Sequence, residues 1–372
     1  MKKMFSILII VLSVIALLLV GIVLFVNLNP RFGGSYSDEK AEAYSRAADF
    51  RDGIFHNASD MQMDMTFTKG LSVMRDFMTA KNREPDHPIP AQPYPVKEIH
   101  ANDGKPDQLV WLGHSAVFMR LNGKAILVDP MMGEKPSPIK WFGSKRFNPQ
   151  LPFEAEDLPY VDIILLTHDH YDHLDHSSVL KLKEKTKTFL VPLGVAAHLE
   201  KWGVDSHKIR EFAWWQGTTI DDIKMTFAPA QHFSGRGLNN RFSTLWGSWI
   251  IQTKNRNIYI SGDSGYANHF KEIGKKFGPF DFAMLECGQY DDRWKDVHMM
   301  PEETFLAAKD LGAQTLMPIH WGAFTLAVHP WDDPPKRLVK ASDESNAQPL
   351  IPEIGQPVIF DNLPETQKWW QQ

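Results

Sequence analysis

Cysteine is nearly absent from this chain, with Cys287 the single example among 372 residues. A disulfide needs two thiols, so a bridge within the chain is excluded. A zinc site made of several thiolates is excluded for the same reason. A metal ion would therefore have to be held by histidine and carboxylate side chains, and the chain offers 15 histidines.

The sequence also lacks any excess or cluster of positive charge. The formal net charge is −5, and no run of lysine and arginine occurs. Nucleic-acid-binding proteins usually carry such basic patches, so nucleic acid is not an expected partner. The remaining composition, 43% hydrophobic and 23% charged, is ordinary for a globular protein of one or two domains.

Charged side chains are missing altogether from residues 4–26. This run exceeds the ~20 apolar residues needed to cross a bilayer core. A cleaved signal peptide is the alternative, but its apolar stretch is roughly 7–15 residues and ends in an A-x-A-like site, which this run does not have. We therefore expect an uncleaved, single-pass anchor in the cell membrane. Lys2 and Lys3 precede the run, and the positive-inside rule then predicts that the main domain lies on the non-cytoplasmic side.

Short β-like runs begin to recur in the sequence near residue 107. We interpret residues 1–28 as the membrane anchor, 29–106 as a connector and N-terminal extension, 107–362 as the main folded domain, and 363–372 as a C-terminal tail. The main domain contains short β-like runs such as "KAILVDP" and "NIYISGD", interspersed with helical patterns such as "PEETFLAAKDLG". Such a mixture of strands and helices predicts an α/β or α+β fold.

One stretch is unusually rich in metal-binding side chains. It reads "THDHYDHLDH" (residues 167–176) and directly follows the strand-like run "VDIILL". Neutral imidazole and carboxylate groups are good ligands for zinc and other borderline metals. A tight loop after the strand could point four of them towards a common centre, namely His168, His170, Asp172 and His173. A solvated polar loop is the alternative, but four histidines in ten residues argue against it.

Further candidate ligands follow other strand-like runs. They are His232 in "FAPAQHFSG", Asp263 in "YISGDSGY" and His320 in "LMPIHWG". Each alone could be a core or loop residue, whereas together they supply what two metal ions require. His114 in "WLGHSA" and His298 in "DVHMMPEE" have two interpretations. They are either capping or core residues, or they contact the ligand residues or the substrate.

The motif "HDHYDH" and the later order of His232, Asp263 and His320 resemble the metallo-β-lactamase superfamily. This resemblance implies a four-layer αββα sandwich with two Zn²⁺ ions per chain in a groove at one edge. It also implies which residues hold each ion, and which aspartate orients a ligand histidine. His168, His170 and His232 would hold one ion, Asp172, His173 and His320 would hold the other, Asp263 would bridge both, and Asp129 in "ILVDP" would be the orienting aspartate.

Longer segments resemble one branch of that superfamily, the N-acylphosphatidylethanolamine-hydrolysing phospholipases D. The segments include "WLGHSAVF", "GDSGY", "GPFD" and "PIHWG", and they occur in order between residues 111 and 335. The resemblance implies a phosphodiesterase in which a hydroxide held between two metal ions attacks a phospholipid. Asp172, Asp263 and His298 are then the expected catalytic residues, and His114 is expected to lie behind a ligand. The membrane span and the extension before residue 107 depart from the animal enzymes of this branch.

Two other functions stay open at this point. The same centre could open a lactone or hydrolyse another small ester, or the chain could be a non-catalytic metal-binding envelope protein. An intact set of seven candidate ligands favours an enzyme over a vestigial site. The expected partners are the lipid bilayer, reached through the N-terminal helix, and a membrane lipid as substrate, with a homodimer kept open.

Overall fold

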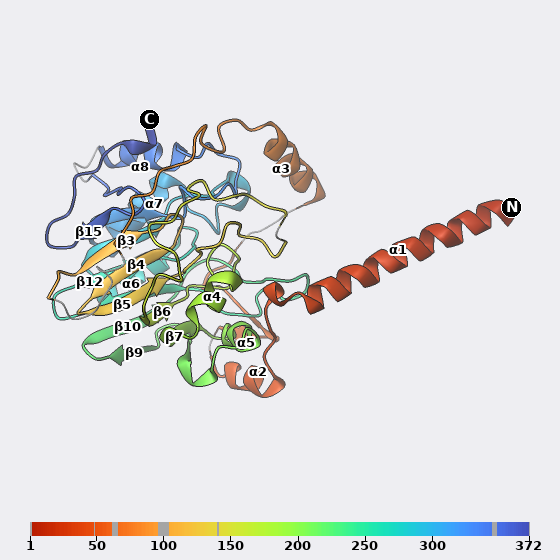
Figure 1. The fold of residues 1–372 in the computed structure, drawn as a ribbon, viewed down its shortest axis with the longest axis horizontal. Coiled ribbons are helices and arrows are strands. Elements are labelled where there is room, and N and C mark those ends of the chain that lie inside the picture. Colours follow the sequence, from red (N-terminus) through yellow and green to blue (C-terminus); the bar gives the residue numbers. More distant parts are fainter. Residues whose placement is uncertain are drawn as a thin grey trace.

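The structure is a computed structural model that describes residues 2–47, 49–61, 66–95, 104–139, 141–343 and 348–371. Its first element is helix α1 (Lys2–Leu28), which projects away from the body of the protein (Figure 1). Among the described residues, one helix is long and apolar enough to cross a membrane, and it covers Lys3–Leu28. None of its apolar window is buried by the rest of the described chain.

Two β-sheets form the centre of the body. The first has seven strands in the order β15-β3-β4-β5-β6-β7-β8, and the second has six in the order β14-β13-β12-β11-β10-β9. The strands of the first sheet are β3 (Gln108–Trp111), β4 (Val117–Leu121), β5 (Lys124–Val128), β6 (Val161–Leu165), β7 (Thr186–Pro192), β8 (Ile209–Phe212) and β15 (Pro357–Ile359). Those of the second are β9 (Gly217–Ile220), β10 (Ile223–Ala228), β11 (Ser248–Gln252), β12 (Asn257–Ile260), β13 (Phe280–Glu286) and β14 (Ala313–Ile319).

The sheets pack face to face, and helices cover their outer faces (Figure 1). The core between the sheets includes Val117 and Ile126 from the first sheet and Ile251 and Met284 from the second. The covering helices are α4 (His176–Leu182) and α5 (Ala196–Lys201) on the first sheet, and α6 (His269–Phe277), α7 (Pro301–Leu311) and α8 (Asp333–Asp343) on the second. Strands β4 and β6 are buried along their whole length because both of their faces are covered. The predicted αββα sandwich is confirmed.

The direction of the strands explains where the candidate ligands gather. Strands β3, β5 and β6 run in one direction in the first sheet, and β10, β12, β13 and β14 run in one direction in the second. The carboxyl ends of strands that run in one direction meet at the same edge of a sheet, where loops carry functional side chains. Every candidate ligand follows the carboxyl end of one of these strands, so the fold collects them at one edge.

The segments before and after the main domain also pack onto it. Residues 29–106 contain α2 (Asp38–Tyr44), β1 (Phe50–Arg51), β2 (Ile54–Phe55) and α3 (Phe67–Thr79). Tyr44 and Phe55 from this segment, and Trp370 from the tail, belong to the core between the sheets. Their large aromatic side chains favour burial over exposure in a loose connector. The connector and tail are therefore integral parts of the folded body.

Candidate metal centre

The first group of ligand atoms combines side chains that follow strands of both sheets. His168, His170, His232 and Asp263 each offer one ligand atom, and these atoms all lie within 4.8 Å of one another. His170 Nδ1 is 2.9 Å from His168 Nε2 and 3.2 Å from His232 Nε2. Asp263 Oδ2 lies 3.6 Å from His168 Nε2. Three imidazoles and one carboxylate therefore face a common centre.

The second group lies beside the first and shares Asp263 with it. His114, Asp172, His173 and His320 offer ligand atoms that also lie within 4.8 Å of one another. Asp263 Oδ1 is 3.1 Å from His173 Nε2 and 3.0 Å from His320 Nδ1. One carboxylate oxygen of Asp263 thus faces each group, which is the arrangement that a bridging ligand needs. All seven ligand residues predicted from the sequence are brought together at this edge.

Local backbone geometry turns the histidine-rich loop towards the centre. After β6, the amides of His173 and Leu174 both donate to His170 O, which closes a tight turn. Asp175 then caps α4 by accepting hydrogen bonds from the amides of Ser177 and Ser178. The turn thus ends where α4 begins, and its side chains do not continue along a strand.

A backbone link joins the two sheets at the site. The amide of His320 donates to His114 O, and the amide of His114 donates to Trp321 O, both over 3.0 Å. His114 and His320 both adopt left-handed backbone conformations, with φ of 56° and 67°. Non-glycine residues rarely do so, and such strain clusters at functional sites.

Each ligand group is held from behind by hydrogen bonds. Asp129 Oδ2 accepts from His173 Nδ1 over 2.8 Å and from Thr167 Oγ1 over 2.6 Å, so the Nε2 of His173 is left for the centre. His114 Nε2 lies 2.8 Å from Asp172 Oδ2. His232 Nδ1 donates to Val297 O over 3.0 Å. Such contacts fix the orientation of metal ligands, and Asp129 and His114 make the contacts expected of them.

Several buried polar atoms at the centre have no hydrogen-bond partner among the described residues. They are His173 Nε2, Asp263 Oδ1 and His114 Nδ1. A buried polar atom without a partner is costly, and so each one calls for an explanation. For His173 Nε2 and Asp263 Oδ1, which both face the second group, a metal ion there supplies it, since imidazole nitrogen and carboxylate oxygen are the donors that Zn²⁺ accepts. The donor sets of both groups, imidazoles with a carboxylate, therefore fit metal ions.

The charges at the centre shift the pKa values of its residues strongly. Burial lowers the pKa of His168 and His232 well below the ordinary value, so both rings stay neutral. Burial opposes the charge on His173 too, but Asp263, Asp172 and Asp129 outweigh it and raise the pKa of this histidine well above the ordinary value. His173 thus holds a proton more tightly than His168 and His232 do.

Glu286, the last residue of β13, also lies at the site, although it is not among the residues predicted from the sequence. Its buried Oε2 lies 2.7 Å from Nδ1 of His298, and its Oε1 accepts from the amide of Met299. Burial, with the nearby charge of Asp263, raises the pKa of Glu286 well above the ordinary value. The signal that could have found it is its place at the end of a strand, which it shares with the ligand residues.

The centre opens into a groove of about 270 Å³. Ligand residues such as His170 and Asp263 line it, together with His298. Its other lining residues include apolar side chains, namely Phe233, Trp294, Val297 and Leu326. The groove therefore combines a polar, metal-competent part with an apolar part.

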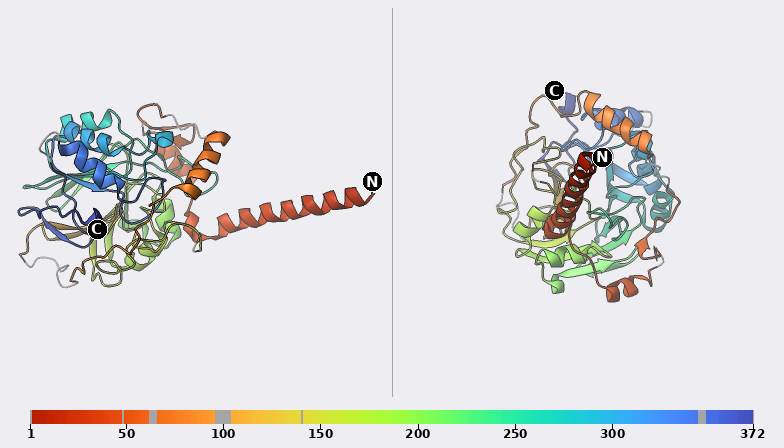
Figure 2. Two further views of the ribbon diagram at one scale, coloured as in Figure 1. Left: turned by 90° about the horizontal axis from the view of Figure 1, so that it is seen from above. Right: turned by 90° about the vertical axis from the view of Figure 1, so that its right-hand side faces the viewer.

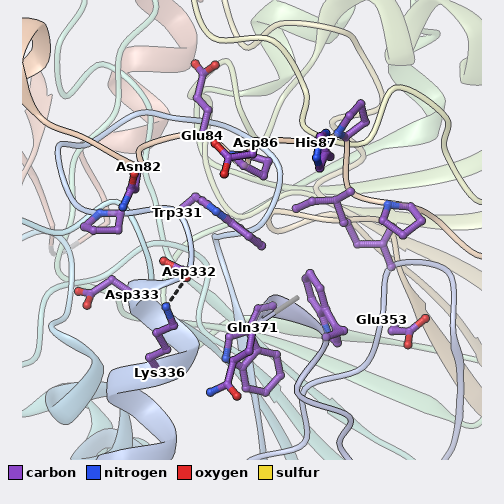
Figure 3. Close-up of a pocket in the computed structure, with 18 residues that line it drawn as sticks. Asn82, Glu84, Asp86, His87, Trp331, Asp332, Asp333, Lys336, Glu353 and Gln371 are labelled. Carbon is purple, nitrogen blue, oxygen red and sulfur yellow. Dashed lines mark hydrogen bonds and ion pairs between the residues drawn. The ribbon is translucent and has the colours of Figure 1, made fainter.

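A larger hollow of about 1020 Å³ lies elsewhere, between residues 82–90, the start of α8 and the C-terminal tail (Figure 3). Acidic side chains line it, including Glu84, Asp86 and Asp332, beside Trp331. None of the predicted site residues belongs to its lining. Asp332 is already paired with Lys336, one helical turn further along the chain (Figure 3). The larger hollow and the metal-competent groove are thus separate features.

Comparisons with known proteins agree with this geometry. A family profile described as a beta-lactamase superfamily domain matches residues 124–321. The chain is 37% identical over 332 residues to an uncharacterised protein of Mycobacterium tuberculosis, with 88% of each chain covered. It is 35% identical over 248 residues to the N-acyl-phosphatidylethanolamine-hydrolyzing phospholipase D 1 of Caenorhabditis elegans, which covers 62% of this chain and 69% of the relative.

The fold is also similar to a solved structure. Igni18, a metallo hydrolase of the archaeon Ignicoccus hospitalis, matches with a TM-score of 0.52 and 22% identity. The match covers 68% of this chain and 98% of that one. At this level of identity the likeness extends to the fold alone.

Proposed function

Because this chain belongs to the beta-lactamase superfamily and is a metal-dependent hydrolase of that fold, we propose that it is a membrane-anchored phosphodiesterase of the phospholipase D type. Its substrates would be lipids of the N-acylphosphatidylethanolamine class. It would hold two Zn²⁺ ions per chain, and α1 would anchor it in the cell membrane with the body on the non-cytoplasmic side. The similarity to the nematode phospholipase, at 35% identity, supports this choice of substrate.

One observation carries the proposal: the two ligand groups meet at Asp263, in a groove that apolar side chains also line. Two metal ions a few ångströms apart suit phosphodiester cleavage because they clamp both the attacking and the leaving oxygen. The apolar side chains of the groove suit a substrate with acyl chains. A small polar ester would make few apolar contacts with Phe233, Trp294 and Leu326, so these side chains would add little to its binding.

The ligand residues would place the two metal ions where the reaction takes place. His168, His170 and His232 would hold one ion, and Asp172, His173 and His320 the other, with Asp263 between them. When bound, such ions activate a water molecule as the nucleophile and offset the charge that develops on the phosphate oxygens. Asp129 and His114 keep the ligand side chains in place, so that little rearrangement is needed on binding.

His298 is the residue best placed to contact the phosphate. It lines the groove, and its ring stacks on that of His320 at a centroid distance of 5.1 Å. Because its Nδ1 is engaged with Glu286, Nε2 is the ring nitrogen left for the substrate. When Glu286 supplies the proton of that bond, the neutral ring carries its own proton on Nε2 and donates it to a phosphate oxygen.

Hydrolysis by the full-length protein in mixed micelles tests the proposal. N-acylphosphatidylethanolamine would be followed by mass spectrometry, with the bound metal quantified in the same sample. We expect release of an N-acylethanolamine and phosphatidic acid, and loss of both products in Asp263→Ala. Bound metal without cleavage of the lipid would contradict the substrate and direct the search to lactones and other esters. A protein with neither bound metal nor activity would contradict the enzyme itself and favour a non-catalytic envelope protein with a vestigial site.

A further inference from the structure

Helix α3 carries a stripe of apolar side chains that nothing in the described structure covers. The stripe consists of Phe67, Leu71, Met74 and Met78, and the exposed fractions of its two ends are 82% and 75%. At 100° per residue these four positions fall within about 60° of arc, so they form one narrow face. Exposed apolar residues scattered singly are ordinary, but an aligned stripe on a helix marks an interaction surface.

The opposite side of α3 is fixed to the wall of the metal-competent groove. Arg293 donates to Asp76 Oδ2 over 2.7 Å and to Ser72 Oγ over 3.0 Å, and both of these residues lie across the helix from the stripe. The next residue, Trp294, lines the groove. The helix is therefore held beside the groove with its apolar stripe turned outward.

A second exposed apolar pair lies at the foot of α1. Trp141 and Phe142 have exposed fractions of 80% and 63%. The loop that leads to them receives hydrogen bonds from the end of the anchor, because Asn29 Nδ2 donates to Pro138 O and Arg31 to Ser137 O. This pair thus adjoins the point where α1 leaves the body.

The foot of α1 is fixed to the metal loop by several contacts. Arg236 donates to Arg31 O through Nε and Nη2, and to Leu174 O in the metal loop over 2.8 Å. Close packing continues at Gly33, where a Cβ atom would lie 2.1 Å from His198 Nδ1. Only glycine fits there, so the anchor meets the body through a packed joint that sets where the metal loop lies relative to α1.

The arrangement in space places these apolar features on one end of the protein. Both side-on views show α3 at the end of the body from which α1 departs (Figures 1 and 2). A bilayer crossed by α1 would meet the body at this end. The stripe of four side chains is also too small for a stable protein interface, which usually buries ~800 Å² on each partner. Continuity with the anchor therefore favours lipid as the occupant.

We propose that Phe67, Leu71, Met74, Met78, Trp141 and Phe142 form a docking face that rests in the interface of the bilayer that α1 spans. The inference extends the proposed function, because it places the groove at the lipid surface and lets a substrate lipid enter it without crossing water. Helix α3 lies in the plane of the membrane with its apolar stripe among the acyl chains, as amphipathic interfacial helices do. Aromatic side chains such as Trp141 suit the same depth.

Fluorescence quenching tests the docking face independently of activity. Full-length Met74→Cys and Leu363→Cys proteins would be labelled with a fluorophore in vesicles of phosphatidylethanolamine and phosphatidylglycerol that contain nitroxide lipids. Cys287 is buried, and burial raises its pKa, so the introduced cysteine takes the label. Leu363 is the control because it is an exposed leucine beyond β15, which lies at the opposite end from α1 (Figure 1).

We expect nitroxide lipids to quench the label at residue 74 and to leave the label at residue 363 bright. Equal quenching at both positions, or none at residue 74, would overturn the proposal. Shielding of residue 74 from water without nitroxide quenching would also overturn it, because a second protein copy would then cover the stripe.

Activity in vesicles provides the second test. The double variant Leu71→Asp/Met74→Asp should hydrolyse a vesicle-embedded lipid roughly tenfold more slowly than the wild type, because two apolar contacts become charged. Turnover of the soluble diester bis(p-nitrophenyl) phosphate should not change, and Leu363→Asp should leave both rates unchanged. Equal loss on both substrates would overturn the docking face. If the wild-type protein hydrolysed neither substrate, the proposed function would be contradicted. The quenching experiment would still show whether the docking face contacts lipid.

Discussion

The metal-competent centre and the docking face are opposite exceptions to the rule that proteins bury apolar side chains and expose charged ones. The centre buries His173 and Asp263, which proteins usually leave in water. The docking face exposes Phe67 and Trp141, which proteins usually bury. In each region the partner that we propose would account for the exception, with metal ions for the buried polar atoms and lipid for the exposed apolar ones.

The two regions differ in the precision that their partners demand. Ligand atoms must lie within a few tenths of an ångström of a metal ion, and the chain supplies several hydrogen bonds to hold them, such as those of Asp129. Binding to a bilayer requires only exposed apolar surface at the depth of the membrane interface, and α3 offers four exposed apolar side chains. Changes at the centre should therefore affect every substrate, whereas changes on the docking face should affect lipid substrates alone.

The largest effect is expected from Asp263→Asn. The amide removes the negative charge shared by the two ligand groups, so hydrolysis of lipid and soluble substrates should both fall by at least ~1000-fold. Asp222→Asn is the matched control, because Asp222 is exposed in the turn between β9 and β10. Values of kcat/KM for both substrates would measure the effect. A kcat/KM value within about tenfold of the wild type would contradict the claim that Asp263 serves both ligand groups.

Asp129→Asn should act on one ligand group only. Its Oδ2 accepts from His173 and from the hydroxyl of Thr167, and its Oδ1 accepts from the amide of Thr167, whereas an asparagine offers one acceptor oxygen in place of two. Affinity for the metal ion at the His173 group should weaken roughly 10- to 100-fold, while the His168 group keeps its ion. Competition with a chelator, followed by metal analysis, would show it. Equal weakening of both ions would mean that the groups are not separately held.

Glu286→Leu separates the orientation of His298 from metal binding. The variant should keep its metal content and lose about tenfold or more in kcat, because nothing then donates to Nδ1 of His298 and fixes its proton on Nε2. Glu286→Gln is the matched control, because its amide can still donate to Nδ1. The pH profile of Glu286→Leu should also change shape, which a purely structural role would not cause. Loss of metal in this variant would place Glu286 among the ligands instead.

Acidification should remove the two metal ions in a fixed order. His173 has a raised pKa, so metal must displace a proton from it already at mildly acidic pH. His168 and His232 have lowered pKa values and stay neutral there. As the pH falls, the ion of the His173 group should therefore leave first. Metal content measured after dialysis over a series of pH values would test this order, and simultaneous loss would contradict it.

The smallest effect is expected from Cys287→Ala. The thiol is buried among apolar residues of the second sheet and its helices, and burial raises its pKa, so it is not a nucleophile. Stability should fall by about 1 kcal/mol through the lost volume, with activity unchanged. Thermal unfolding and a rate assay would measure both. Loss of activity in a folded variant would assign the thiol a role that the geometry does not give it.

Much of the centre could be predicted because its signals are local. Four histidines in ten residues after an apolar strand indicate a metal-competent loop. Asp263 and His320 likewise follow the ends of apolar strands. Parallel strands then bring these ends together without further information. The long apolar helix α1 could also be predicted, because its length and its lack of charge are read directly from the sequence.

The rest depends on contacts between distant segments. Glu286 is a lone acid at a strand end, and only the fold shows that it meets His298. The spacing of Phe67, Leu71, Met74 and Met78 indicates an amphipathic helix, but spacing cannot tell whether the apolar face meets a core or a membrane. The connector could not be recognised as part of the core, because Tyr44 and Phe55 find their partners only in the assembled body.

Metal stoichiometry tests the central claim most directly, namely that the two ligand groups joined by Asp263 form one dinuclear centre. Metal-free, full-length protein would be titrated with Zn²⁺, and the bound metal would be counted per chain by mass spectrometry of the elements. The structure predicts saturation at about two ions per chain in the wild type and a loss of at least one in Asp263→Asn. Saturation at one ion or none in the wild type, or the same count in both proteins, would contradict it.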